Sequence, residues 1–318
     1  MKTEERLNEA YKKAKIIEFN DDSKIIFFSD VHRGDNSNSD EFAHNQSTYF
    51  HALSYYFNHG YTYVEVGDGD EMWEHSKFSL IRSAHSDVYY LLSKIYQAGK
   101  LIMLYGNHNN SLRDPNFVKK NFYYFYDDYL EKGSDLFPGI EVHESIILKH
   151  SRTNHEIFVV HGHQGDLMND QLWWFSMMTV RYFWRFMHVI GFRNPASPAK
   201  NVLKQHKIEK NFSRWIAKYG KILLCGHTHR PKFPAKGDVP YFNSGCCVHP
   251  RGISGIEILD GKIMLVDWRV RPNLNGVLYI DRKVIKGPIS LDNFEEVEIN
   301  KDIPEKHVTR ISRNGSFE

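Results

Sequence analysis

The sequence lacks most features that would set it apart from ordinary globular proteins. It has only three cysteines, Cys225, Cys246 and Cys247, and none has Cys-x-x-Cys spacing. Two of them are adjacent, which is poor geometry for a structural disulfide, so we expect reduced, buried thiols in a cytoplasmic protein. No apolar run is long enough to span a membrane, and residues 1–15 are too charged for a signal peptide.

A strong charge of one sign is also missing. The formal net charge is +2, with 25% charged and 41% hydrophobic residues, which is typical of a globular domain that buries a core. We therefore expect no dedicated nucleic-acid binding, although a local basic patch is compatible with this composition. Histidine is abundant, with 18 copies, and this abundance suits metal chemistry. The sequence leaves the oligomeric state open.

The first part of the chain alternates strands with helices. Apolar strands are predicted at 25–28, 61–66 and 101–105, with helices over about 42–58 and 78–97 between them. This order is typical of stacked βαβ units. Ligands of such sheets gather outside the carboxyl ends of the strands.

After residue 130 the pattern changes to antiparallel pairing. Further strands are predicted at 140–148, 156–160 and 221–225, and a hairpin around Asp260-Gly261 at 255–259 and 262–268. The sequence therefore predicts an α/β fold with two sheets and flanking helices.

Side chains that can bind metals follow five of these strands. They are Asp30 and His32, Asp68, Asn107, His161, and His227 and His229. Carboxylate, carboxamide and imidazole ligands suit manganese, iron or zinc, and the lack of cysteine among them argues against a structural zinc site. Seven ligands are too many for one ion. With one bridging carboxylate they suffice for two ions about 3.5–4 Å apart.

Five motifs in order carry a family resemblance. They are Asp-x-His at 30–32, Gly-Asp-x-x-Glu at 67–71, Gly-Asn-His at 106–108, His-Gly-His at 161–163 and Gly-His-Thr-His at 226–229. Over about residues 25–245 the chain resembles the calcineurin-like metallophosphoesterase superfamily. The resemblance implies a four-layer αββα sandwich of two mixed sheets. It also implies two divalent transition metal ions, manganese first, with iron or zinc as alternatives.

The resemblance implies a role for each matching residue. One metal would be held by Asp30, His32 and His229, and the other by Asn107, His161 and His227, with Asp68 as the bridge. His108 would act as the general acid. Glu71 stands where the family usually has an aspartate that orients this histidine. Asn109 stands where the family often has an acidic residue.

The expected reaction is hydrolysis of a phosphoester or pyrophosphate bond, with a metal-bridging hydroxide as the nucleophile. Arg33 and Arg230 follow metal-binding motifs and could bind a phosphate oxygen, although each could equally be a surface arginine. A nuclease or a cyclic-nucleotide phosphodiesterase is an alternative activity. A non-catalytic binding module on the same fold is an alternative of another class.

Residues 167–219 are rich in aromatic side chains and interrupt the series of motifs. We interpret them as a helical cap over the site, in which Trp174 contacts the substrate and an apolar face meets an acyl chain or a bilayer surface. A helical hairpin packed on the core is the alternative.

A finer resemblance is to the UDP-2,3-diacylglucosamine pyrophosphohydrolase-like branch. It rests on Gly67–Trp73, the aromatic insertion and Gly-His-Thr-His-Arg-Pro at 226–231. It implies a small-molecule substrate such as a UDP-sugar or a lipid-linked diphosphate. We expect residues 1–280 to form the metallophosphoesterase domain and 281–318 a C-terminal extension.

Overall fold

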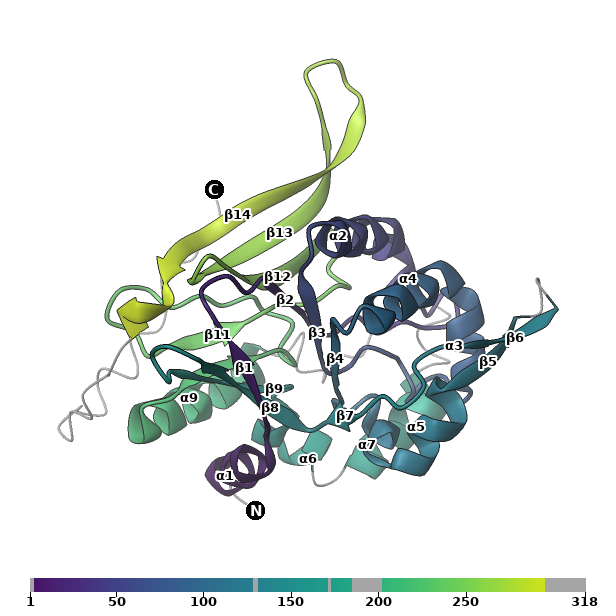
Figure 1. Ribbon diagram of the computed structural model, residues 1–318. Coiled ribbons are helices and arrows are strands. Elements are labelled where there is room, and N and C mark those ends of the chain that lie inside the picture. Colours follow the sequence, from purple (N-terminus) through teal and green to yellow (C-terminus); the bar gives the residue numbers. More distant parts are fainter. Residues whose placement is uncertain (1–2, 128–130, 171–172, 185–201, 295–318) are drawn as a thin grey trace.

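The computed structural model describes residues 3–127, 131–170, 173–184 and 202–294. In this part of the chain two mixed sheets pack face to face, and helices cover the outer side of each (Figure 1). The predicted α/β fold with two mixed sheets and flanking helices is confirmed.

The larger sheet has seven strands in the order β14-β13-β12-β2-β3-β4-β7. Four of its strands run parallel: β2 Ile25–Phe28, β3 Thr62–Val66, β4 Leu101–Leu104 and β7 Val142–His143. The other three add antiparallel: β12 Ile253–Leu259, β13 Lys262–Pro272 and β14 Leu278–Ser290.

The smaller sheet has five strands in the order β1-β8-β9-β10-β11. They are β1 Lys15–Phe19, β8 Ser145–His150, β9 Glu156–Val160, β10 Ile222–Cys225 and β11 Tyr241–Asn243. Only β8 and β9 pair antiparallel, as the sequence predicts for this pair. A separate ribbon joins β5 Tyr124–Asp127 to β6 Lys132–Asp135.

Buried apolar side chains form three layers, one between the two sheets and one between each sheet and its helices. Ile25 and Phe27 of β2 face the other sheet, whereas Ile26 and Phe28 face the helices. Successive strand residues point to opposite faces, so a continuous apolar run such as this one fits a strand covered on both sides.

Each sheet has its own set of helices on its outer face. The seven-stranded sheet is covered by α2 Gln46–Asn58, α3 Phe78–Ala84, α4 Ser86–Gln97 and α5 Pro115–Phe122. The five-stranded sheet is covered by α1 Thr3–Lys13 and α9 Val202–Tyr219. The short helices are η1 Ala43–Asn45, η2 Asn110–Arg113, η3 His163–Gly165, α6 Leu167–Asp170, α7 Trp173–Thr179, the π-helix η4 Val180–Trp184 and η5 Leu291–Phe294.

The helix predicted over 78–97 is two helices, because the backbone leaves the helical conformation at His85. The buried imidazole of His85 lies 2.8 Å from Asp40 and 3.0 Å from Gln46. These contacts tie the break between α3 and α4 to the segment around α2.

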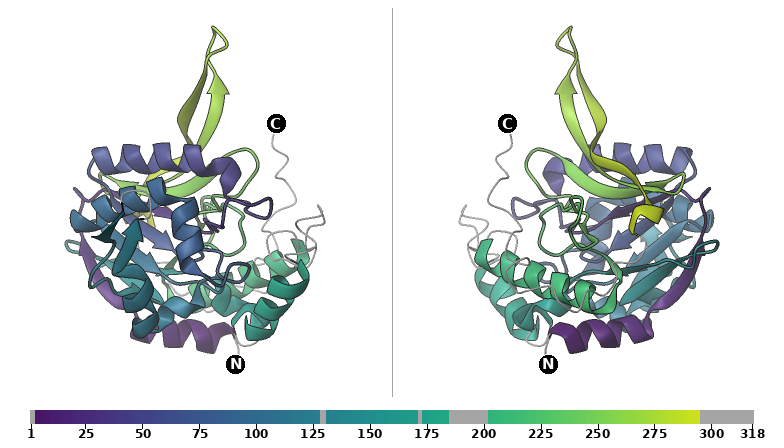
Figure 2. Two further views of the ribbon diagram at one scale, coloured as in Figure 1. Left: turned by 90° about the vertical axis from the view of Figure 1, so that its right-hand side faces the viewer. Right: turned by 90° about the vertical axis from the view of Figure 1, so that its left-hand side faces the viewer.

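The sheet continues beyond the expected end of the domain at residue 280. The boundary falls inside β14, which pairs with β13 from Lys262↔Ser290 to Pro272↔Leu278. The two strands form a hairpin that extends past the body of the molecule (Figure 2). The expected boundary thus falls inside a paired strand, and residues 295–318 of the expected extension lie outside the described residues.

The segment 167–219 has two different parts. Helix α9 buries Ile208, Phe212 and Trp215 against the five-stranded sheet, so here the core interpretation holds. In α7 and η4, by contrast, apolar side chains are exposed, with Trp174 at 55% and Tyr182 at 70%. Residues 171–172 and 185–201 of the expected cap lie outside the described residues. No helix in the described ranges is long and apolar enough to cross a membrane.

A buried ion cluster joins the loops that follow β2 and β3. The guanidinium of Arg33 is fully buried and donates two hydrogen bonds of 2.8 Å to Glu65 and one of 2.8 Å to Asp70. Asp70 also accepts from the hydroxyl of Tyr89. This position does not fit the expected phosphate contact, because Arg33 would have to leave both carboxylates. Arg33 instead has a structural role, because it binds Glu65 and Asp70 and so joins the segments after β2 and β3.

We predict that Arg33→Ala destabilises the fold by about 3–5 kcal/mol, because two carboxylates would remain buried without their cation. Urea denaturation of the metal-free protein measures this loss. Arg152→Ala is the matched control, since Arg152 is exposed in its ion pair with Asp21, and it should change stability far less. If Arg33→Ala changed stability no more than Arg152→Ala does and instead raised KM, Arg33 would be a substrate contact after all.

Candidate metal centre

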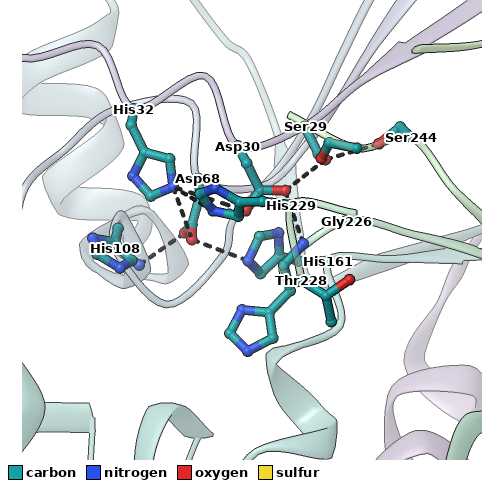
Figure 3. A network of polar contacts seen from close by, with 12 residues as sticks. Ser29, Asp30, His32, Asp68, His108, His161, Gly226, Thr228, His229 and Ser244 are labelled. Carbon is teal, nitrogen blue, oxygen red and sulfur yellow. Dashed lines mark hydrogen bonds and ion pairs between the residues drawn. The ribbon is translucent and has the colours of Figure 1, made fainter. Parts of the chain in front are cut away.

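The carboxyl ends of strands from both sheets meet at one place and bring the predicted ligands together (Figure 3). Asp30 follows β2, Asp68 follows β3, and Asn107 follows β4 of the larger sheet. His161 and His227 follow β9 and β10 of the smaller sheet. Three groups have ligand atoms within 4.8 Å of one another: Asp30, His32 and His229; Asp68, His161 and His227; and His32, Glu71 and His108.

Asp68 lies between the two groups that the sequence assigns to separate metals. Its Oδ2 is 3.0 Å from Nε2 of His161 and 3.9 Å from Nε2 of His32. Its Oδ1 accepts a 2.8 Å hydrogen bond from the backbone N–H of His108. The carboxylate is therefore near residues of both groups.

Asp30 is oriented by the backbone of His227 and by Ser29, a residue that the sequence analysis did not single out. Its Oδ2 accepts hydrogen bonds from Ser29 Oγ at 2.6 Å and from the backbone N–H of His227 at 2.8 Å. Ser29 in turn lies 2.8 Å from Ser244 (Figure 3). The other oxygen, Oδ1, is left 3.1 Å from Nε2 of His229. The position of Ser29 directly before Asp30 was the available signal.

Hydrogen bonds also fix which nitrogen two of the imidazoles present to the cluster. Nδ1 of His161 lies 2.9 Å from the carbonyl of Val66, so it carries the proton and Nε2 faces the cluster. Nδ1 of His32 lies 2.8 Å from Glu71, which leaves its Nε2 toward the cluster in the same way. Such outer partners are usual for histidines that bind metals.

Several buried polar atoms here have no hydrogen-bond partner among the described residues. They include both amide atoms of Asn107 and Nε2 of His227. A buried polar atom without a partner is costly, so such atoms call for a ligand. These donors fit a divalent cation, and Asp166, 3.6 Å from His227, is a further carboxylate that the sequence analysis did not assign.

The electrostatics of the cluster favour added positive charge. Burial lowers the pKa of His229, but the negative charge of Asp30 outweighs this and raises it to about 10. Burial raises the pKa of Asp68, but the nearby His161 and His108 hold it well below its usual value. Burial lowers the pKa of His227, which favours a neutral imidazole at neutral pH.

The backbone at the site is in an uncommon conformation. The left-handed region holds five of the predicted ligands: Asp30, His32, Asp68, His227 and His229, with φ from 50° to 67°. Residues other than glycine reach this region at a cost of about 1–3 kcal/mol each. Close packing adds a constraint, since a Cβ on Gly106 would lie 2.2 Å from Oδ1 of Asp68.

His108 lies beside the cluster with its orientation fixed. Its Nδ1 is 2.8 Å from Oε1 of Glu71, the same carboxylate that contacts His32. Burial raises the pKa of Glu71, but the charges and hydrogen bonds of the two histidines hold it well below its usual value. Asn109 accepts a 2.7 Å hydrogen bond from the N–H of Gly106, which steadies the loop that carries Asn107 and His108.

The predicted substrate contacts are only partly assembled. Arg230 is half-buried next to His229, and no hydrogen bond or ion pair holds it within the described part of the chain. Trp174 contacts Phe175 edge to face, with ring centroids 5.9 Å apart. None of the described contacts joins Trp174 to the cluster.

The architecture and the cluster agree with a comparison against protein families. Residues 23–231, more than half of the chain, match the model described as calcineurin-like phosphoesterase. The chain therefore belongs to the calcineurin-like phosphoesterase family, whose members are metal-dependent phosphoesterases. The family resemblance predicted from the sequence is therefore confirmed, whereas the finer resemblance to the UDP-2,3-diacylglucosamine pyrophosphohydrolase-like branch is not.

Among curated proteins, none matches the chain. Among solved structures, the chain is similar to a mutant cold-active protein tyrosine phosphatase, with 10% identity and a TM-score of 0.38. The match covers 86% of this chain and 83% of the other. A likeness this distant supports no statement about function.

Proposed function

We propose that this phosphoesterase holds two divalent transition cations at the seven ligands around Asp68, and hydrolyses a small-molecule phosphoester or diphosphate there. One observation carries the proposal: motifs from two separate sheets converge on a single carboxylate. Asp30, His32 and His229 form one ligand group, and Asn107, His161 and His227 the other.

The donor set supports this assignment. Carboxylate, carboxamide and imidazole groups suit manganese, with iron or zinc as alternatives. The negative charge of Asp30 raises the pKa of His229, and a bound cation would supply positive charge there as it displaces the proton. Bound cations would supply an activated water and neutralise phosphate oxygens at neutral pH.

His108 is the proposed general acid. Glu71 holds its Nδ1, so Nε2 is the nitrogen that can give a proton to the leaving oxygen as the P–O bond breaks. The side chain is 21% exposed, which permits contact with a substrate beside the cluster. Arg230 is the proposed contact to a phosphate oxygen, because it follows His229 directly and is half-buried.

The substrate proposal rests on the exposed apolar side chains of α7 and η4: Trp174, Phe175, Met178 and Tyr182. This segment follows His161 in the chain after η3 and α6, and Arg181 of η4 binds the carbonyls of Met72 and Trp73, in the loop that carries Asp68 and Glu71. A UDP-sugar or lipid-linked diphosphate would offer the phosphate groups to the cluster and an apolar part to these side chains. The same face is the proposed site of contact with a bilayer surface.

Metal content tests the two-ion assignment. Protein prepared without chelator should contain about two transition ions per chain, and Asp68→Ala should lower this to about one or fewer, because both groups share this carboxylate. Elemental analysis measures the content. Asp22→Ala, on an exposed aspartate outside the cluster, should keep the wild-type value. A single ion that survives Asp68→Ala would contradict the assignment.

The acid is tested by His108→Ala. We expect turnover to fall about 10²–10⁴-fold, the usual contribution of a general acid, with metal content unchanged. Steady-state kinetics and elemental analysis of the same preparation measure both. His44→Ala, an exposed histidine away from the cluster, is the control. Loss of metal would instead make His108 a ligand, and unchanged turnover would remove it from the mechanism.

The apolar face is tested by Trp174→Ala. Activity on a small nitrophenyl ester should stay close to wild type, whereas activity on an acylated nucleotide sugar should fall, because remote binding energy assists the larger substrate. Trp215→Ala in the core is the matched control. It should lower stability by about 3–5 kcal/mol without changing selectivity. Equal losses on both substrates in Trp174→Ala would remove this face from the substrate site.

A further inference from the structure

The imidazole of His108 has a third contact besides Glu71 and the cluster. The indole of Trp73 stacks on it, with ring centroids 4.1 Å apart and an angle of 21° between the planes. His32 meets the same imidazole edge to face at 4.6 Å. Together with the bond to Glu71, these rings restrict how far His108 can turn.

Nothing in the described chain holds the indole through its own polar atom. Trp73 is 4% exposed, and its Nε1 has no hydrogen-bond partner among the described residues. Its orientation therefore depends on packing and on the backbone that carries it. That backbone is part of the loop that also supplies Asp68 and Glu71.

A single arginine from the helical insertion binds this backbone. Arg181 of η4 donates from Nε to the carbonyl of Trp73 at 2.9 Å and from Nη2 to the carbonyl of Met72 at 2.9 Å. A planar guanidinium that binds two successive carbonyls fixes direction as well as distance. The contact joins residues more than one hundred positions apart in the sequence, 108 for Trp73 and 109 for Met72.

We propose that Trp73 and Arg181 are positioning residues for the general acid: the insertion holds the loop through Arg181, and the loop holds Trp73 against His108. This inference rests on the proposed role of His108. With the ring held, Nε2 stays directed at the leaving oxygen and its proton passes there as the P–O bond breaks. A displacement of the catalytic imidazole by about 1 Å can lower the rate as much as about 100-fold, so the stacking of Trp73 on His108 should affect turnover strongly.

The dependence on the leaving group distinguishes positioning from general stability. Nitrophenolate leaves readily without a proton, whereas phenolate needs the acid. The ratio of kcat/KM for matched 4-nitrophenyl and phenyl esters should rise about 10- to 100-fold in Trp73→Leu and in Arg181→Gln, as it should in His108→Ala. Trp73→Phe, which keeps a flat ring, should restore most of the wild-type ratio.

A double-mutant cycle completes the test. In the His108→Ala background, Trp73→Leu should not change the ratio further, because its effect passes through the missing imidazole. Tyr90→Ala is the control, since Tyr90 of α4 is 64% exposed and belongs neither to the cluster nor to the apolar face of α7 and η4, and it should keep the wild-type ratio. If Trp73→Leu fails to fold, Arg181→Gln, on a partly exposed side chain, makes the same comparison.

Equal losses on both esters, or a further change of the ratio in the His108→Ala background, would overturn the inference and leave Trp73 as core packing. If His108→Ala raises the ratio and the other variants do not, only this inference fails. If His108→Ala itself leaves the ratio unchanged, the proposed acid fails as well. The experiment therefore separates the two proposals.

Discussion

The carboxylate of Asp68 is contacted by residues that follow strands of both sheets. It lies 3.0 Å from His161 of one sheet and 3.9 Å from His32 of the other. The separation of these histidines is set by the apolar layer between the sheets, in which Phe27 and Val159 belong to the same core. Because such interiors are close-packed, a change in the size of a side chain in this layer would change the distance between His161 and His32.

A second set of contacts holds the loops after the strands have ended. Arg33 joins the loops after β2 and β3 through its hydrogen bonds to Glu65 and Asp70. Ser29 joins Asp30 to Ser244, which follows β11. All of these groups are buried, and their mutual hydrogen bonds replace part of the hydration that they lose on folding. These contacts tie together loops that come from distant segments of the chain.

The sequence was most informative where structure is local. The strand ends and the ligand types follow from short apolar runs and adjacent polar residues, so that part of the fold and site could be predicted. β14 could not, because Gly287 and Pro288 interrupt its sequence and none of its residues is fully buried, so that pairing with β13 stabilises it. The burial of Arg33 depends on Glu65, 32 residues away, and the contact of Arg181 with Trp73 spans 108 residues. The composition and periodicity of a sequence do not show which residues far apart in the chain come into contact.

The left-handed backbone of the proposed metal ligands costs stability at the positions whose side chains serve the proposed chemistry. Asp30, His32, Asp68, His227 and His229 all have positive φ. In the folded chain without metal, glycine or asparagine would relieve part of this strain. A search for more stable variants that ignored metal binding would therefore favour substitutions that remove the ligands. Thermostabilised forms of this protein should be sought at other positions, or selected with the metal bound.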